Sequence, residues 1–281
     1  MKIVHTIQEV RSAVTSARRA GKCIGFVPTM GNLHEGHFSL IDAAREGCDF
    51  VVVSVFVNPT QFGPGEDYES YPRTLDADAV GCRDRGVDVV FAPSAAEMYP
   101  EGFATTVHVS GVSEILCGAS RPGHFDGVCT VVAKLFGIVM PDRAYFGAKD
   151  YQQSVVIRRM AMDLNWPVEI EVCPTVREPD GLAMSSRNQY LSPSARQQAG
   201  GLQAALQAAA DRLRVGDGAG KAEATLHEQI AARVPDGQID YAVVRDAETL
   251  GPVTAQTRSA LLALAVKLDG ARLIDNIVVD A

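Results

Sequence analysis

The sequence predicts an α/β fold in which a Rossmann-like, doubly wound parallel sheet is followed by a smaller α+β domain. Apolar segments of strand length alternate with helical patterns through the first two-thirds of the chain. Several of these segments are continuously apolar, which is typical of parallel strands covered by helices on both faces. The expected strands are Cys23–Val27, Phe50–Val57, Val87–Ala92, Thr106–Val109, Ala144–Phe146 and Ile170–Cys173.

Two helical patterns support this alternation. Val10, Val14 and Ala17 share one face of an amphipathic first helix. Apolar residues spaced three and one apart from Val128 to Val139 indicate another helix, and the proline that follows two residues later stops it. Strands that alternate with helices are typical of a parallel sheet with right-handed crossovers.

The pattern changes after about residue 190. Ser192 and Pro193 suit the N-cap and first turn of a helix that runs to about Arg214, and a second helix is expected from about Lys221 to Val234. Helices followed by strands predict a mostly antiparallel sheet. We therefore expect a catalytic domain over residues 1–187 and a second domain over residues 188–281. The strands expected in the second domain are Ile239–Arg245, Leu261–Val266 and Leu273–Val279.

Composition excludes several classes of function. The 281 residues include 26 Lys and Arg against 34 Asp and Glu, a formal net charge of −8, which disfavours a broad nucleic-acid-binding surface. No apolar segment reaches the roughly 18 residues that span a bilayer, and the N-terminus lacks the apolar stretch of a signal peptide. The six cysteines form no CxxC pair and are expected to be reduced core thiols. We expect a cytoplasmic protein that binds neither nucleic acid nor membrane.

The segment Pro28–His37 carries the clearest chemical signal. It follows an expected strand and precedes a helix expected from about Phe38 to Glu46. Loops in this position of an α/β sheet bind phosphates. His34 and His37, at the start of the helix, can donate hydrogen bonds to phosphate oxygens. The alternative is a pair of surface histidines on a turn.

Two polar loops after this segment are further candidates. The amides of Asn58 and Gln61 follow the second long strand and suit hydroxyl and carboxylate groups of a small substrate. A carboxylate in the segment Tyr71–Asp78 could hold Mg²⁺ while phosphates supply the other oxygen ligands. Taken alone, the first loop is more often a polar turn than a site, and the second is a solvated helix start.

Two later loops complete the set. Lys149 follows an expected strand and could neutralise a triphosphate, and Gln153 could reach a substrate from the first turn of the next helix. Two hydroxyls and a guanidinium in the segment Met184–Arg187 make an anion clamp. A surface lysine and an ordinary linker are the alternatives.

Five segments, in this order and spacing, resemble the pantothenate synthetase (pantoate–β-alanine ligase) family. They are PTMGNLHEGHFSLI, VNPTQFGPGEDYESYPRT, GHFDGVCTVVAKLF, FGAKDYQQ and REPDGLAMSSRNQYLS. The later segments RDAETL and ARLIDN are similar to that family too, so the resemblance covers essentially the whole chain. The HxGH element with the late Met-Ser-Ser-Arg element also resembles, more broadly, the nucleotidylyltransferases and class I aminoacyl-tRNA synthetases.

The resemblance implies an ATP-dependent condensation of pantoate with β-alanine to form pantothenate. The carboxylate of pantoate would attack the α-phosphate of ATP, giving pantoyl adenylate and pyrophosphate. The amine of β-alanine would then displace AMP. The resemblance also implies Mg²⁺, a cytoplasmic homodimer and a C-terminal domain that acts as a lid.

The same resemblance assigns the site residues. The catalytic residues would be His37, His34, Lys149 and Arg187. Pantoate would be bound by Gln61 and Gln153, β-alanine by Gln61, and Mg²⁺ by Asp78. The residues that would bind ATP are Met30, Gly31, Asn32, Leu33, His34, Glu35, Gly36, His37, Gly147, Ala148, Lys149, Asp150, Val176, Met184, Ser185, Ser186 and Arg187. The family usually has glutamate where this chain has Ala148, so a carboxylate is missing beside Lys149.

Two other functions stay open on the residues alone. An HxGH nucleotidylyltransferase acting on a phosphorylated small molecule would share the histidine motif. Such an acceptor calls for more arginines, whereas the paired amides of Gln61 and Gln153 suit pantoate. A non-catalytic nucleotide-binding regulator would not need two histidines, a lysine and an arginine together.

Overall fold

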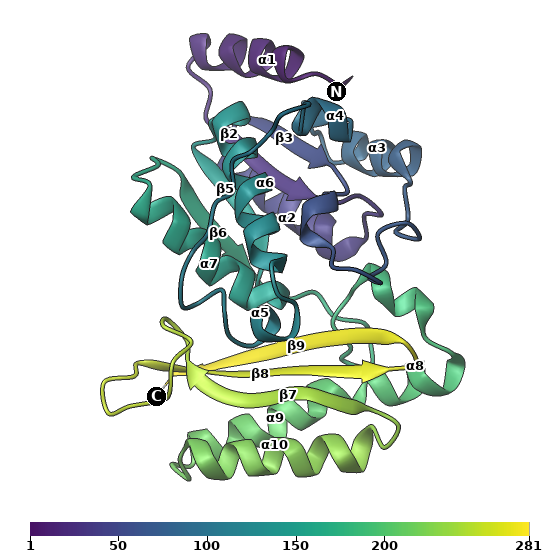
Figure 1. Ribbon diagram of the computed structural model, residues 1–281, viewed down its shortest axis with the longest axis vertical. Helices are drawn as coiled ribbons and strands as arrows, with labels where there is room; N and C mark the ends of the chain where they lie inside the picture. The colour runs from purple at the N-terminus through teal and green to yellow at the C-terminus, as the bar shows by residue number, and fades with distance from the viewer. Residues whose placement is uncertain (281) are drawn as a thin grey trace. The chain divides into compact units, whose positions relative to one another are not determined.

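A six-stranded sheet organises the first part of the chain (Figure 1). Its strands lie in the order β1–β4–β3–β2–β5–β6, and each neighbouring pair is parallel. This arrangement confirms the predicted doubly wound α/β class. The strands are β1 (Lys2–Val4), β2 (Ile24–Thr29), β3 (Phe50–Val55), β4 (Val89–Phe91), β5 (Arg143–Gly147) and β6 (Glu169–Cys173).

Successive residues of β2 show how both faces of the sheet are covered. Phe26 makes an edge-on ring contact with Phe136 of α6, while its neighbour Val27 belongs to a buried cluster with Ile41 of α2. Because side chains alternate along a strand, these two helices lie on opposite faces. Helix α1 packs with α6, and α3 packs with α2. The helices are α1 (Ile7–Arg19), α2 (Glu35–Gly47), α3 (Leu75–Asp84), α4 (Ala95–Met98), α5 (Cys117–Ser120), α6 (His124–Val139) and α7 (Tyr151–Asp163), with 3₁₀ turns η1 (Pro59–Gln61) and η2 (Ala148–Asp150).

The winding of the sheet reverses between β2 and β5. From β2 the chain continues to β3 on one side, and from β5 it continues to β6 on the other side. The carboxyl ends of the strands at such a switch point are the usual ligand site of an open α/β sheet. The loops that follow β2 and β5 are therefore the first places to look for a site.

The computed structural model describes residues 1–280 and divides into two compact units. The first unit comprises Met1–Ala148 and Val156–Pro174, and the second comprises Lys149–Val155 and the chain from Thr175 onward. The second unit thus takes in two short segments outside the predicted range 188–281, and that domain division stays a prediction. In residues 1–280, no helix combines the length and apolar character that crossing a bilayer requires.

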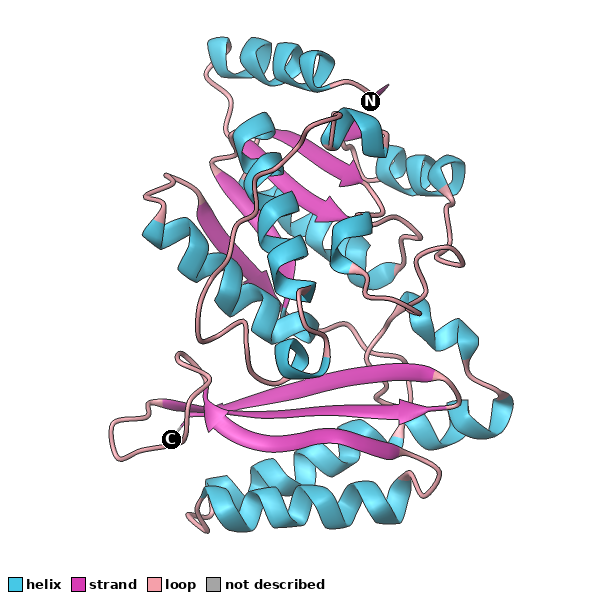
Figure 2. Cartoon of the chain, in the orientation of Figure 1, coloured by secondary structure: helices cyan, strands magenta, loops and turns pink. Residues whose placement is uncertain are grey.

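The second unit contains a three-stranded antiparallel sheet in the order β7–β8–β9, with α9 and α10 along one side of it (Figure 2). The predicted α+β class is therefore confirmed. The single long helix expected up to Arg214 is interrupted at Gly200, and a second helix begins at Gly201. A Cβ atom at Gly201 would lie 2.8 Å from Cβ of Arg233, so the close packing of α10 excludes a side chain there. The elements are η3 (Ser186–Tyr190), α8 (Pro193–Ala199), α9 (Gly201–Arg214), α10 (Ala219–Arg233), β7 (Gln238–Asp246), β8 (Ser259–Leu268) and β9 (Ala271–Asp280).

In the first unit, one strand prediction was wrong and one strand was missed. The segment Thr106–Val109 forms no strand, because the backbone N–H of Val107 donates to the Thr130 hydroxyl of α6 (3.0 Å) rather than to another strand. Conversely, the short strand β1 was not expected. Its three residues pair with β4, and only Val4 among them is buried, so the sequence offers little strand signal.

Helix α6 approaches the 3₁₀ turn η1 so closely that only glycine fits between them. A Cβ atom at Gly127 would lie 2.3 Å from the carbonyl oxygen of Thr60 and 2.6 Å from Cα of Gln61. These neighbours are backbone atoms, so they cannot move aside as a side chain would. A side chain at this position of α6 would therefore displace the turn that carries Gln61.

We expect Gly127→Ala to destabilise the protein by about 1–3 kcal/mol, the usual cost of overpacking, as measured by urea unfolding. The matched control is Gly137→Ala in the same helix, where a Cβ atom meets nothing within 4 Å. That variant should be neutral or more stable by up to about 1 kcal/mol, because alanine favours helix. Equal effects of the two substitutions would contradict the proposed close contact.

Candidate functional site

Three loops of the first unit meet at the carboxyl edge of the sheet. Met30–His37 follows β2, Asn58–Gln61 follows β3, and Gly147 ends β5. Strands β3, β2 and β5 are adjacent and parallel. The sequence-predicted residues of these loops therefore share one edge of the sheet, at the switch point described above.

The loop after β2 is anchored by a buried carboxylate. Gly31 and Asn32 both have positive φ (84° and 51°), which turns the chain sharply. Asp78 of α3 is only 3% exposed and accepts hydrogen bonds from the backbone N–H groups of Asn32 (3.0 Å) and Leu33 (2.8 Å). The Thr74 hydroxyl donates to the same carboxylate at 3.2 Å. Burying a carboxylate is costly unless it is hydrogen-bonded, so Asp78 and the loop stabilise each other.

The two histidines form the N-terminal cap of α2. The helix begins at Glu35, three residues before the predicted start at Phe38, and this places His34 at the N-cap and His37 at the third helical position. The backbone N–H of Gly36 donates to Nδ1 of His34 (3.1 Å), and the backbone N–H of His34 donates to Nδ1 of His37 (3.4 Å). The two ring centroids lie 4.2 Å apart.

These bonds fix where each neutral ring carries its proton. A backbone N–H can only donate, so Nδ1 of His34 and of His37 must accept, and the proton then resides on Nε2. Each ring therefore has an Nε2–H donor at the positive end of a helix. That combination suits hydrogen bonding to an anionic oxygen.

Backbone amides of this loop are largely used within it. Besides the amides already described, the N–H of Gly31 donates to the Thr29 hydroxyl at 3.2 Å, and that of His37 donates to the carbonyl of His34 at 2.8 Å. A glycine-rich phosphate loop instead turns its free N–H groups toward the ligand. Here the groups suited to phosphate are the imidazole side chains.

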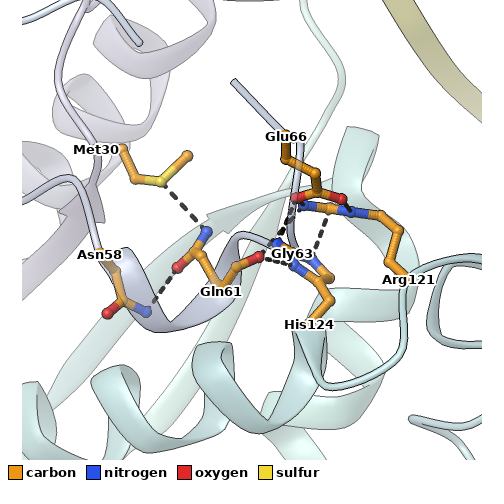
Figure 3. Close-up of polar contacts among 7 residues, drawn as sticks. All are labelled: Met30, Asn58, Gln61, Gly63, Glu66, Arg121 and His124. Atoms are coloured by element: carbon orange, nitrogen blue, oxygen red, sulfur yellow. Dashed lines mark hydrogen bonds and ion pairs between the residues drawn. The ribbon is translucent and has the colours of Figure 1, made fainter. Parts of the chain in front are cut away.

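Gln61 is held at both its side chain and its main chain (Figure 3). Asn58, which is 1% exposed, donates from Nδ2 to Oε1 of Gln61 at 3.0 Å, and Gln61 donates from Nε2 to the Met30 sulfur at 3.2 Å. The carbonyl oxygen of Gln61 accepts from Nδ1 of His124 at 2.8 Å. A thioether sulfur is a weak hydrogen-bond acceptor. A stronger acceptor, such as a substrate oxygen, could therefore replace the Met30 sulfur as the partner of the Gln61 Nε2 group.

Glu66, Arg121 and His124 extend this cluster, and the sequence did not single them out. Arg121 holds the Glu66 carboxylate with two hydrogen bonds of 2.7 and 2.6 Å and lies 3.1 Å from Nε2 of His124. Burial opposes the charged form of Glu66, but the hydrogen bonds and charge of Arg121 outweigh it, so the pKa of Glu66 lies below its ordinary value. The two residues are 55 positions apart in the sequence, so local patterns could not reveal the pair.

The remaining predicted residues lie at the end of β5 and in the second unit. Gly147 ends β5, and Ala148 begins η2. The Lys149 ammonium lies 3.7 Å from the Asp150 carboxylate. Gln153 is half-buried in the first turn of α7. The carboxylate expected at residue 148 in this family is absent, and Asp150 is the acid that pairs with Lys149.

The segment from Val176 to Met184 is a small hairpin of the second unit. The N–H of Met184 donates to the carbonyl of Val176 at 3.0 Å, and the chain reverses at Gly181, whose φ is +92°. Ser185 then caps η3, because its hydroxyl accepts from the N–H of Arg187 at 3.3 Å. The predicted residues Met184, Ser185, Ser186 and Arg187 thus lie where the hairpin ends and η3 begins.

Comparison with known proteins identifies the family. A family model described as pantoate-beta-alanine ligase matches residues 2–278. The chain belongs to the pantoate–β-alanine ligase family. The pantothenate synthetases of Moorella thermoacetica and Trichlorobacter lovleyi are 54% and 53% identical to it, over 100% and 99% of this chain and 99% and 98% of theirs.

Solved structures of the family share the fold. Pantothenate synthetase from Thermus thermophilus is 50% identical, with a TM-score of 0.94 over 99% of both chains. The pantoate–β-alanine ligase from Francisella tularensis, complexed with beta-gamma ATP and beta-alanine, is 35% identical, with a TM-score of 0.79 over 99% of this chain and 97% of that one. The resemblance inferred from the five sequence segments is therefore confirmed.

The anchoring role of Asp78 predicts the effect of Asp78→Asn. An amide places an N–H₂ group against a backbone N–H, so one buried donor loses its acceptor, and we expect a loss of about 1–3 kcal/mol in urea unfolding. The control is Asp76→Asn in the same helix; Asp76 is exposed, and the change should fall within about 0.5 kcal/mol.

The same variant tests the predicted magnesium ligand. If Asp78 acts by anchoring the loop, the Mg²⁺ concentration for half-maximal activity stays unchanged in Asp78→Asn. A raised Mg²⁺ requirement with unchanged stability would contradict the anchoring role and support Asp78 as a metal ligand.

Proposed function

We propose that this chain condenses pantoate with β-alanine in an ATP-dependent reaction that forms pantothenate. The reaction proceeds through pantoyl adenylate, with release of pyrophosphate and then AMP. The observation that carries the proposal is the pair of capped histidines, His34 and His37, at the switch point of the sheet in a chain of this family. The ligand pair in the Francisella tularensis relative, an ATP form and β-alanine, agrees with it.

His34 and His37 serve the adenylation step. When the carboxylate of pantoate attacks the α-phosphate, negative charge moves onto the departing pyrophosphate. The Nε2–H donors of both rings and the N-terminus of α2 stabilise that charge, and His37 is the assigned proton donor, a role that requires its protonated ring. Since the cap fixes both rings, little reorganisation is needed as the charge develops.

Gln61 binds pantoate and borders β-alanine. Asn58 holds the amide oxygen of Gln61, so its Nε2 group remains the donor toward a substrate. A hydroxyl or carboxylate oxygen of pantoate is a stronger acceptor than the Met30 sulfur now in that position. Gln153 is assigned to pantoate on the family likeness.

The ATP assignments cover both units. In the first unit they include Met30–His37, Gly147 and Ala148. In the second they include Lys149, Asp150, the backbone of Val176 and the segment Met184–Arg187, with Lys149 and Arg187 supplying positive charge. The lid role of the C-terminal domain, which would exclude water from the reactive adenylate, is proposed on the family likeness.

Mg²⁺ is proposed to enter with the triphosphate. The Asp78 carboxylate already accepts three hydrogen bonds, and residues 1–280 contain no group of three or more His, Cys, Asp or Glu side chains placed to hold an ion. This donor set does not fit a resident metal, so no step is assigned to protein-bound magnesium. A cytoplasmic homodimer is proposed on the family likeness.

Exchange of labelled pyrophosphate into ATP tests the proposal. We expect exchange to require pantoate and Mg²⁺ but not β-alanine, because the adenylate forms before the amine reacts. His37→Ala should lower the exchange rate by roughly 10²–10⁴-fold, the usual range for a positioned acid–base group. His37→Gln should recover part of that loss if hydrogen-bond donation suffices.

The matched control is His5→Ala, since His5 is exposed, follows the edge strand β1, and its ring bonds to the carbonyl of Ala92 rather than to the histidine loop. Its exchange rate should equal that of the unsubstituted protein. If exchange required β-alanine, a concerted ligation would replace the adenylate mechanism. Exchange supported by a phosphorylated acceptor in place of pantoate would favour the nucleotidylyltransferase alternative.

A further inference from the structure

The segment ARLIDN, which the proposed site does not use, ends in two buried polar residues of β9. Asp275 is 3% exposed and Asn276 is 8% exposed. Their strand pairs with the largely apolar strand β8, where they lie opposite Leu264 and Ala263. Buried polar side chains are costly unless they are hydrogen-bonded, so their partners indicate what they are for.

Asp275 holds the hairpin that leads to Met184. The Arg177 guanidinium donates to both oxygens of this carboxylate, at 2.6 and 2.9 Å. Arg177 also donates to the carbonyl of Gly181 at 3.0 Å, across the turn of the hairpin. A bidentate pair of this kind fixes both position and orientation. The hairpin is thereby attached to β9 just before the proposed nucleotide clamp begins.

Asn276 holds the main chain at Lys149. Its Nδ2 group donates to the carbonyl oxygen of Lys149 at 2.9 Å. Two residues later, the Tyr151 hydroxyl donates to the carbonyl of Ala247 at 3.0 Å, and Ala247 belongs to RDAETL, the other segment without an assigned role. Both contacts lie within the second unit.

We propose that Asp275 and Asn276 are positioning residues of the ligase. Two consecutive residues of β9 hold the main chain at Lys149 and the hairpin before Met184–Arg187. Both proposed ATP-binding segments of the second unit are therefore positioned by the same strand. This inference rests on the proposed function, because it assumes that those segments bind ATP.

The test separates ATP from pantoate kinetics in Asn276→Asp, which keeps the size of the side chain but replaces the donor by an oxygen facing the Lys149 carbonyl. We expect KM for ATP to rise about tenfold, the equivalent of one lost buried hydrogen bond, with KM for pantoate within about twofold. A purely structural role would lower the active fraction, and thus kcat, without changing KM for ATP.

Arg177→Lys is the second variant, since it keeps the charge but loses the bidentate geometry, and it should show the same selective rise. The control is Asp280→Asn, on the same strand but exposed and bonded to the Ser259 hydroxyl, which should change neither constant. Unchanged KM for ATP in both test variants would overturn the inference. Failure of the unsubstituted protein to exchange pyrophosphate would instead overturn the proposed function.

An independent observation concerns two thiols in the first unit. The sulfur atoms of Cys23, just before β2, and Cys48, at the C-cap of α2, lie 2.7 Å apart. That is closer than unbonded sulfurs normally lie, although both residues are free cysteines. Gly25 makes room for this approach, because a Cβ atom there would lie 3.1 Å from Cβ of Cys48.

The two thiols differ in environment. Cys23 is half-buried, whereas Cys48 is 6% exposed. Burial, followed by the hydrogen bond to Cys23, raises the pKa of the Cys48 thiol to about 12. Cys48 is therefore the poorer first nucleophile, and Cys23 is the thiol that an oxidant reaches first. The pair lies at the amino end of β2, and the histidine loop follows its carboxyl end.

We infer that Cys23 and Cys48 are an oxidative modification site that closes to a disulfide with a hydroperoxide. The Cys23 sulfur attacks the peroxide, so an S–O bond forms, the O–O bond breaks, and an alcohol (water, for hydrogen peroxide) leaves with the Cys23 proton. The Cys48 sulfur then attacks the sulfenic acid, the S–O bond breaks, and water leaves with the Cys48 proton. In sum, two thiols and one hydroperoxide give one disulfide, one alcohol and one water.

Closure would join the two ends of the strand–loop–helix segment that carries His34 and His37. A cross-link restricts the unfolded chain, so oxidised protein should melt several degrees higher than reduced protein. Trypsin cleaves after Arg45, between the two cysteines, so their pairing is readable by mass spectrometry. We expect hydrogen peroxide to produce a cross-linked pair of peptides, Cys23–Arg45 with Glu46–Arg73, that dithiothreitol separates.

Cys23→Ser and Cys48→Ser should each abolish both the cross-linked peptide and the rise in melting temperature. Cys129→Ser, at a buried cysteine of α6, is the control and should retain both. Sulfinic acid on Cys23 with a free Cys48 thiol, or pairing of either residue with another cysteine, would overturn the inference. Pyrophosphate exchange is measured separately and does not decide this outcome.

Discussion

The candidate site depends on one buried carboxylate. Asp78 closes the left-handed turn at Gly31 and Asn32 by accepting the amides of Asn32 and Leu33. Without an acceptor there, two N–H groups of a tight loop would lose their partners, at a cost comparable to that of the hydrogen bonds themselves. Because α2 begins directly after this loop, Asp78 also decides where the histidine cap of α2 lies relative to the sheet.

A carboxylate holds the loop that is proposed to bind phosphate. The Asp78 charge is spread over two backbone donors and the Thr74 hydroxyl, so these dipoles largely offset its repulsion of a phosphate. The amides consumed in this way cannot also bind the ligand. In the proposed function, anion recognition therefore falls to His34 and His37 rather than to the backbone. Imidazoles, unlike amides, can also deliver a proton, which suits a reaction that creates a leaving group.

The sequence predicted what local patterns determine. Continuously apolar segments identified five strands of the parallel sheet, and the order of turns and helices identified the class. It missed β1, which is a strand because it pairs with β4 and not because its residues are apolar. It wrongly assigned a strand at Thr106–Val109, where the Thr130 hydroxyl of α6 accepts a backbone hydrogen bond that a neighbouring strand would otherwise accept. It placed His34 and His37 in a loop that could bind phosphate. Their reciprocal capping could not be read from spacing, because it requires the backbone to turn at Gly31 and Asn32 first.

Contacts distant in sequence explain the rest of what prediction missed. Arginine and glutamate usually lie on the protein surface, so the sequence gives no sign that Arg121 and Glu66 pair. Only the fold brings them together beside Gln61. Gln61 is then constrained from four directions, by Asn58, Met30, Arg121 and His124. These four contacts fix the position of Gln61 and leave its amide donor directed at a weak acceptor, the thioether sulfur. In the proposed function, a pantoate oxygen that replaces the sulfur would gain a stronger hydrogen bond, so the contacts that hold Gln61 in place would also present its amide donor to the hydroxy acid.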